Sequence, residues 1–211
     1  MATIDVAVFG VDTFNNNSDI SIADIDTYVE SVWESEIEDG SGDYEAQFDS
    51  WAIEIPDSTA CQSCSDYWER ANDFDNWLQD NDNWCCYGSY DVIIIADYHD
   101  GNDAHHGVAQ EIAGTSTNKV AIVNDKDLEG NSTWDPDGTQ KVATHELLHM
   151  FIDNSDSEHY PHVNSNSEGT VMWDSGNVES NCWNNTDAGQ VIDEVSSCTT
   201  SKVRTWIDNN M

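Results

Sequence analysis

Two histidines four residues apart, with a glutamate beside the first, are the strongest chemical signal in the chain. They are His145, Glu146 and His149, in the run His-Glu-Leu-Leu-His. On a helix, residues four apart lie on one face, so both imidazoles can bind one ion, and nitrogen ligands suit Zn²⁺. Glu146 lies next to the first ligand and can take a proton from a zinc-bound water as general base. The spacing therefore predicts one catalytic zinc ion and hydrolytic chemistry.

A catalytic zinc site also needs a third protein ligand and an open fourth position. The candidates follow the motif in a polar segment: His159, His162, Asp156 and Asp153. Only seven histidines occur in the chain against 42 acidic residues, so a histidine here carries more information than an aspartate. We expect His159 to be the third ligand, and His162, Asp156 and Asp153 are the alternatives.

The segments that must position these residues predict an α/β fold. Apolar, β-rich stretches predict four strands, at residues 4–11, 44–55, 90–97 and 119–123. A short edge strand is expected at residues 107–112. Helical spacing of apolar residues predicts three helices, at residues 24–38, 139–152 and 187–208. This order predicts one domain over residues 1–211, in which a mixed, mostly parallel sheet packs against the active-site helix and a C-terminal helix.

A second motif, Gly169-Thr170-Val171-Met172-Trp173, stands before the C-terminal helix. Together with the HExxH run it resembles the metzincin-type zinc peptidases, which carry HExxHxxGxxH/D and then a Met-turn beneath the zinc. The resemblance implies that Met172 belongs to a Met-turn and that residues 107–112 form an antiparallel edge strand holding an extended peptide. It also implies a zinc endopeptidase that acts on proteins or peptides.

The chain departs from that family pattern directly after the motif. Ile152 occupies the family's glycine position and Ser155 its third-ligand position. The third ligand is therefore expected from a longer loop, within residues 153–184, which also contain the Met-turn. A divergent metzincin-like domain is the resulting prediction.

Two other functions are compatible with the same zinc motif. One is a non-catalytic binding protein with a zinc-stabilised fold, and the other is a zinc hydrolase of a non-peptide amide. The intact Glu146 argues against the first, because a purely structural site closes its fourth position and needs no base. A peptide-binding edge strand would favour a peptidase over the second.

Charge is the dominant feature of the composition. The chain has 42 acidic and 6 basic residues and a formal net charge of −36. A surface this negative repels itself, and at about 1 M salt the Debye length falls to roughly 3 Å and screens most of the repulsion. Because the acidic residues run along the whole chain, we expect adaptation to high salt rather than a dedicated surface for cations or a basic substrate. The shortage of Lys and Arg argues against a nucleic-acid partner. No apolar run is long enough for a membrane span. We also expect the protein to be a monomer.

Six cysteines favour disulfides and an oxidising compartment. Four lie in a predicted helical insertion, residues 58–88: Cys61, Cys64, Cys85 and Cys86. Their pairing is open, and Cys182 with Cys198 is the remaining pair. A metal site on the first four is the alternative, but adjacent cysteines suit a structural zinc site poorly. Residues 1–10 predict a strand and not a signal peptide. Either the protein stays inside the cell or this is a mature, secreted form whose leader has been removed, and the six cysteines favour the second option.

Two weaker features complete the survey. Residues 125–130 are similar to the start of an EF-hand calcium loop, but Pro136 stands where the loop needs its last acidic ligand. Calcium is therefore only weakly supported. His105 and His106 precede the edge strand, where they could line a cleft or bind a second metal, but we expect a polar loop pair.

Overall fold

The architecture is taken from a computed structural model of the whole chain. It describes residues 3–60, 67–82, 87–99, 106–110, 119–128, 131–152, 168–172 and 189–211. Everything said below about structure concerns these residues.

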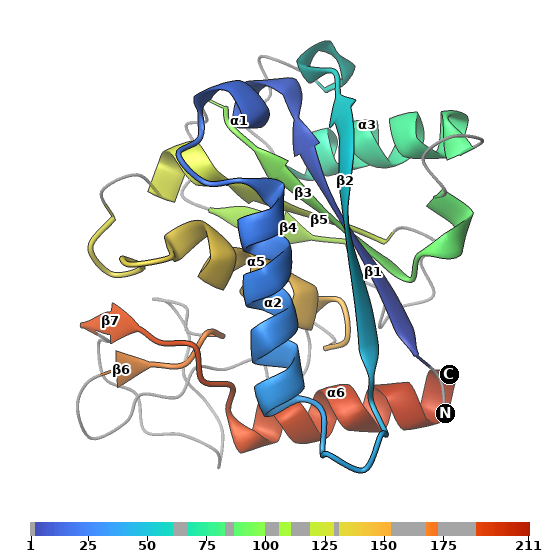
Figure 1. Cartoon of the computed structure of the whole chain (residues 1–211), viewed down its shortest axis with the longest axis vertical. Coiled ribbons are helices and arrows are strands. Elements are labelled where there is room, and N and C mark those ends of the chain that lie inside the picture. The colour runs from blue at the N-terminus through green and yellow to red at the C-terminus, as the bar shows by residue number, and fades with distance from the viewer. Residues whose placement is uncertain are drawn as a thin grey trace.

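A five-stranded sheet organises the fold (Figure 1). Its strands, in spatial order, are β2 (Ala46–Ile55), β1 (Ile4–Val11), β3 (Val92–Asp97), β5 (Val120–Asn124) and β4 (Gly107–Ala109). All neighbouring pairs are parallel except β4 with β5, which is antiparallel. This arrangement confirms the predicted single-domain α/β fold with a mixed, mostly parallel sheet, and β4 is the antiparallel edge strand expected there.

The inner strands β3 and β5 are apolar up to their last residues, Asp97 and Asn124, because helices cover both faces of the sheet. Every residue of β3 and of β5 is buried. Successive side chains point to opposite faces, so Ile94 and Ile93 belong to two separate buried clusters. Parallel strands with both faces covered need this kind of continuous apolar sequence.

Four longer helices complete the layers. They are α2 (Ile22–Glu36), α3 (Tyr67–Asp80), α5 (Gly138–His149) and α6 (Ser197–Asn210). Helices α2, α5 and α6 share the buried cluster on one face of the sheet, whereas α3 packs against the other face (Figure 1). Helix α3 confirms that the predicted insertion contains a helix.

Short elements join these layers. They are the helix α1 (Asp12–Asn17), the 3₁₀ turns η1 (Asp57–Thr59), η2 (Tyr87–Ser89) and η3 (Asp125–Leu128), and the parallel pair β6 (Glu168–Gly169) and β7 (Gln190–Val191). The pair β6–β7 brings residues 168–172, which precede Trp173, against the chain that leads into α6.

Two predicted helix boundaries were wrong. The C-terminal helix begins at Ser197 and not near residue 187, because Val191 pairs in β7 and the Ser196 hydroxyl caps the helix by accepting the Thr199 backbone N–H at 3.1 Å. The active-site helix ends at His149 and not at Ile152. There the Met150 N–H turns back to the Leu147 carbonyl, which tightens the last turn.

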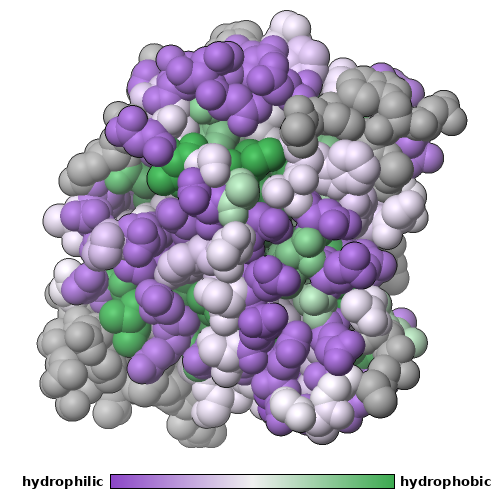
Figure 2. All heavy atoms as spheres, viewed as in Figure 1, coloured by the Kyte–Doolittle hydropathy of each residue, from purple (hydrophilic) through white to green (hydrophobic). Residues whose placement is uncertain are grey.

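Three of the six basic side chains bind backbone carbonyls inside the fold. Lys141 Nζ donates to the Pro136 carbonyl at 2.6 Å, and Arg204 Nε donates to the Ile37 carbonyl at 2.7 Å. Lys119 Nζ donates to the carbonyls of Tyr87 and Tyr90 in the same way. These three cations therefore fix loops. Hydrophilic side chains cover most of the face seen in Figure 2.

The helices in the described part of the chain are all too short or too polar to cross a membrane.

Candidate metal centre

Helix α5 carries the HExxH motif and is held between the sheet and α2. Nearly all of its residues are buried, including polar ones such as Thr139 and Thr144. Its first turn is anchored by the Thr139 hydroxyl, which donates to Asp125 Oδ1 at 2.5 Å. The start of the helix is thus tied to the segment that follows β5, and burial along its length holds the motif in its last two turns.

The two motif histidines meet at their Nε2 atoms. His145 Nε2 and His149 Nε2 are 2.6 Å apart, and the ring centroids are separated by 4.3 Å. His145 Nδ1 lies 2.9 Å from the Val171 carbonyl oxygen. A carbonyl can only accept, so His145 carries its proton on Nδ1 and directs the Nε2 lone pair toward His149.

This geometry fits a metal ion bound by both Nε2 atoms. Two nitrogen ligands of a tetrahedral zinc ion, each about 2.0–2.1 Å from it, lie roughly 3.3 Å apart, so a small opening of the pair would suffice. Metal-binding histidines usually donate their other ring N–H to a carboxylate or a backbone carbonyl, as His145 does here. Within the described residues no third His, Cys, Asp or Glu joins the pair. The expected third ligands, His159, His162, Asp156 and Asp153, lie outside the described residues, so the choice among them stays a prediction.

The segment that resembles a Met-turn contacts the first histidine. Val171, whose carbonyl accepts from His145, also donates its own N–H to the Glu194 carbonyl at 3.0 Å. Met172 is fully buried in the same apolar cluster as Leu148. Val171 is therefore held through both its N–H and its carbonyl, and Met172 belongs to the same apolar core as α5.

Glu146 points to another side of the helix, toward the edge strand β4. Its side chain is 7% exposed. A Cβ built on Gly107 would lie 2.7 Å from Glu146 Oε1, so the carboxylate occupies the space beside this glycine. Glu146 is thus placed between the metal-binding face of α5 and the edge of the sheet.

Strand β4 turns polar backbone groups outward at two positions. The Asn124 N–H donates to the His106 carbonyl at 2.9 Å, and the Gln110 N–H donates to the Val120 carbonyl at 3.0 Å. Hydrogen-bonded pairs alternate along an antiparallel ladder. Gly107 and Ala109 therefore direct their N–H and C=O groups away from β5, and among the described residues no further strand pairs with that edge.

Trp134 links the two sides of the site. Its ring packs edge-on against His145 at 6.2 Å between centroids and against His106 at 6.4 Å. His106 Nε2 lies 3.2 Å from Asn131 Nδ2. His106 is therefore packed beside the site through Trp134, while His105 lies outside the described residues.

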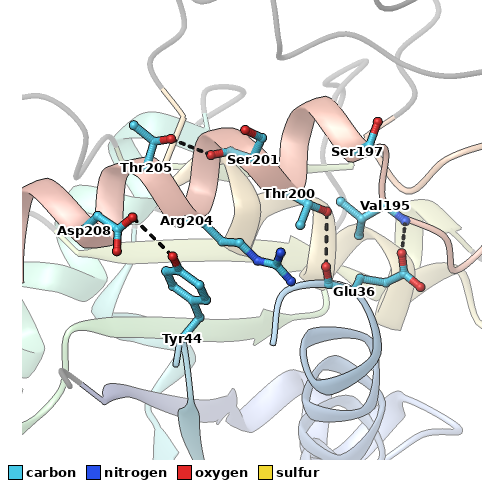
Figure 3. A pocket seen from close by; sticks show the side chains of 9 residues that line it. All are labelled: Glu36, Tyr44, Val195, Ser197, Thr200, Ser201, Arg204, Thr205 and Asp208. Atoms are coloured by element: carbon cyan, nitrogen blue, oxygen red, sulfur yellow. Dashed lines mark hydrogen bonds between the residues drawn. The ribbon is translucent and has the colours of Figure 1, made fainter. Parts of the chain in front are cut away.

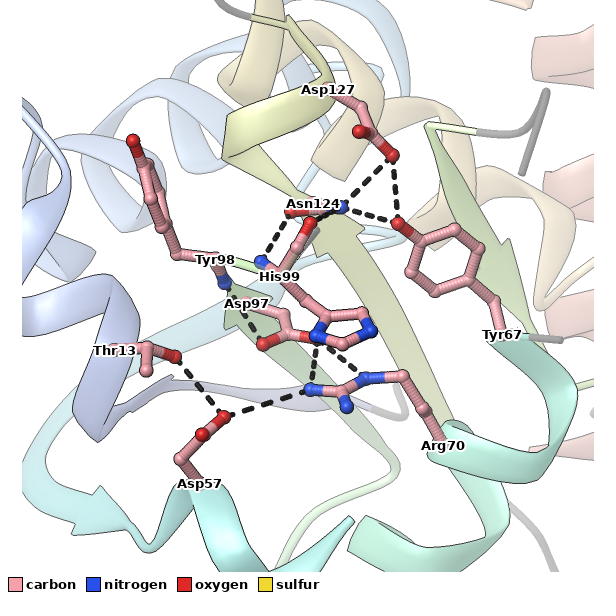
Figure 4. Close-up of polar contacts among 9 residues, drawn as sticks. All are labelled: Thr13, Asp57, Tyr67, Arg70, Asp97, Tyr98, His99, Asn124 and Asp127. Atoms are coloured by element: carbon pink, nitrogen blue, oxygen red, sulfur yellow. Dashed lines mark hydrogen bonds and ion pairs between the residues drawn. The ribbon is translucent and has the colours of Figure 1, made fainter. Parts of the chain in front are cut away.

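A buried polar network lies at the carboxyl ends of β3 and β5 (Figure 4). Arg70, from α3, pairs with Asp97 through Nη2 at 2.7 Å and Nε at 2.8 Å. The Asn124 side chain accepts the His99 N–H at 3.1 Å and donates to the His99 carbonyl at 2.9 Å. Burial raises the pKa of Asp97, and the Arg70 guanidinium acts in the opposite direction. The network fixes the start of the segment that leads from β3 toward β4.

The acidic residues of the calcium-like segment take part in structural hydrogen bonds. Asp127 Oδ2 accepts from the Tyr67 hydroxyl at 2.8 Å and from Asn124 Nδ2 at 2.9 Å, and Asp125 accepts from Thr139. These contacts explain both side chains without an ion, and calcium binding stays a prediction.

A surface pocket of about 560 Å³ lies between α6 and the end of α2 (Figure 3). Its most distinctive side chain, Arg204, donates to the carbonyls of Ile37 and Glu38 and lies 5.3 Å from the Tyr44 ring centroid. Arg204 thus ties α6 to the chain after α2. We interpret the pocket as a groove along the packing boundary between α6 and the chain after α2.

Cys198 is disulfide-bonded in the first turn of α6. The other five cysteines lie outside the described residues, so the pairing with Cys182 stays a prediction.

Several residues that shape the site are difficult to recognise from the sequence because they are distant from the motif. Gly107, Trp134 and Val171 are 39, 11 and 26 residues from their motif partners, and only the Met-turn motif pointed to one of them. A glycine at the start of a predicted edge strand was the available signal for Gly107.

A comparison with protein-family models gives no match to this sequence, and a comparison with curated proteins gives none either. The function is therefore inferred from the residues of the site.

Proposed function

We propose that the protein is a zinc-dependent endopeptidase of a divergent, metzincin-like kind, which hydrolyses peptide bonds in proteins or peptides at high salt. The observation that carries this proposal is the convergence of His145 Nε2 and His149 Nε2 at 2.6 Å, with His145 oriented by the Val171 carbonyl. Metal ions are commonly bound by a histidine pair on one helical face in which a backbone carbonyl accepts the other ring N–H and so fixes the tautomer.

Each residue of the site has a defined task. His145 and His149 would hold the zinc ion together with a third ligand, for which His159 is our choice. The bound zinc would polarise the scissile carbonyl and make water acidic enough to lose a proton near neutral pH. Glu146 takes that proton and can deliver it to the leaving amine. Its burial against β4 holds the carboxylate at one place and limits its exchange with bulk water.

The edge strand supports a peptide as substrate. The outward N–H and C=O groups of Gly107 and Ala109 match an extended peptide, which could add to the sheet as one more strand. Such pairing would recognise the backbone of the peptide rather than its side chains. This supports a peptidase more than a hydrolase of small amides, which would have no use for a strand edge that no other described strand occupies.

The test combines metal analysis with one substitution. Purified in high salt, the protein should hold about one zinc ion per chain and should cleave a mixture of quenched fluorescent peptides. Glu146→Gln should keep its zinc and its melting temperature but lose at least about 10²-fold in kcat, because the base is removed. Glu34→Gln is the matched control, since Glu34 is an exposed glutamate on α2. Metal-free protein with full activity, or an undiminished Glu146→Gln variant, would exclude the proposal.

A further inference from the structure

The backbone conformation at residue 107 does not require a glycine. The described glycines with positive φ are Gly40 and Gly42, and Gly107 is not among them. Its backbone belongs to β4 and pairs with Val123 of β5. Other residues adopt extended backbone readily, and a glycine in a strand weakens it. The need for glycine here must come from the surrounding space.

The space on the α5 side of Gly107 is filled by Glu146. A Cβ at residue 107 would lie 2.7 Å from Glu146 Oε1 and 2.8 Å from Glu146 Cγ. The Ile122 carbonyl oxygen of the neighbouring strand would also be 2.7 Å away, so the added atom would be crowded by the backbone of β5 as well. Ordinary contacts of a Cβ begin near 3.4 Å, so an alanine would push the carboxylate by at least about 0.7 Å or open the β4–β5 pairing.

We propose that Gly107 is a positioning residue that seats the Glu146 carboxylate: the missing side chain at this point of β4 creates the niche that holds the base. The backbone N–H and C=O of Gly107 face outward along the same edge. The niche therefore sets the carboxylate beside the line that an extended peptide would follow. This inference rests on the proposed function where it assigns Glu146 as the base, but the packing of Gly107 against Glu146 is independent of it.

The first experiment is a double-mutant cycle in stability, which needs no activity. Gly107→Ala should lower the melting temperature by roughly 2–12 °C, the range expected for one overpacked methyl group in a domain of this size. In the Glu146→Ala background the same change should cost measurably less, because the contacts with Glu146 Oε1 and Cγ are gone and only the contact with the Ile122 carbonyl oxygen remains. Gly88→Ala is the control, since its added methyl would meet Asp82 Oδ1 at an ordinary 3.6 Å.

The second experiment measures where the base lies. In steady-state peptide hydrolysis, Gly107→Ala should lower kcat by about 10- to 100-fold, since a misplacement near 1 Å can cost about 10²-fold. KM should change by less than about threefold and the zinc content should be unchanged, because the atoms nearest to a Cβ at Gly107 belong to Glu146 and Ile122 and not to His145 or His149. Gly88→Ala should match the wild type in kcat and KM.

The outcomes separate this proposal from the proposed function. An equal loss of melting temperature in both backgrounds, or an unchanged kcat in Gly107→Ala, would overturn the role of Gly107 and leave the peptidase assignment standing. A wild-type protein that hydrolyses no peptide would remove the assignment, and the stability cycle would still test the niche. If the single variant Gly107→Ala does not fold, a folded double variant Gly107→Ala/Glu146→Ala supports the proposal. If neither the single nor the double variant folds, the proposal is contradicted.

Discussion

Removing Arg70 should expose how strongly the end of β3 depends on one buried ion pair. Arg70 and Asp97 are both fully buried, and two guanidinium nitrogens lie within 2.8 Å of the same carboxylate oxygen. The Arg70→Met variant keeps much of the buried apolar stem but leaves Asp97 without its cation. Breaking one side of a buried pair typically costs about 3–5 kcal/mol. For a domain of this size that corresponds to a fall in melting temperature of about 6–20 °C.

The loss should depend on pH with a definite sign. Burial already raises the pKa of Asp97 above its ordinary value, and Arg70 opposes that rise. Without Arg70 the folded-state pKa rises further, so the folded variant binds a proton that the unfolded chain has released. Its stability therefore falls as pH rises through this window and recovers toward about pH 4, where the unfolded carboxyl is protonated too. The deficit relative to wild type should shrink at low pH.

Thermal melts followed by circular dichroism would measure this effect between about pH 4 and pH 8. Salt should hardly change the deficit, because the buried pair is poorly screened. Adding Asp97→Asn should recover part of the loss, since an amide removes the charge and keeps an acceptor for the Tyr98 N–H. Arg204→Met, which removes donors only to carbonyls, should cost less and show no such pH dependence. A deficit below about 1 kcal/mol, or one independent of pH, would refute the reasoning.

Three further predictions concern charge and metal. Burial, with the nearby charge of Glu30, raises the pKa of Asp26 to about 6, so folding stability should fall as pH rises through that value. The Asp26→Asn variant should therefore have a higher melting temperature at pH 8 and a nearly unchanged one at about pH 4. Equal effects at the two pH values would contradict this. The wild-type melting temperature should climb between about 0.1 M and 3 M salt as surface repulsion is screened, and a flat or falling series would argue against a high-salt protein. His159→Ala should lower zinc content far more than Asp156→Ala by elemental analysis, whereas loss only in His162→Ala would move the third ligand to that residue.

Local sequence was enough to predict the frame of the site. His145, Glu146 and His149 are spaced for one helix, and a helix of that sequence brings both imidazoles to one side whatever surrounds it. The continuous apolar run of β3 requires burial on both faces, which predicted a central parallel strand. These properties follow from periodicity over a few residues, and they are confirmed by α5 and by the order of the sheet.

The boundaries and the supports of the site depended on contacts between distant residues. The last helix starts at Ser197 because Val191 pairs with Gly169, and no local pattern encodes a partner 22 residues earlier in the chain. The chain after His149 likewise turns to bury Phe151 and Ile152 in the common core. Apolar spacing is compatible with helix in both places, and only tertiary packing decided against it.

The sequence by itself determined which groups could bind zinc and take a proton, because chemical type and helical spacing are local. Only the tertiary structure decided how those groups are held. The Val171 carbonyl fixes the tautomer of His145, and the bare backbone of Gly107 makes room for Glu146. Both contacts join segments far apart in the chain, and their energies depend on distances of a few ångströms that only the packed sheet and helices set.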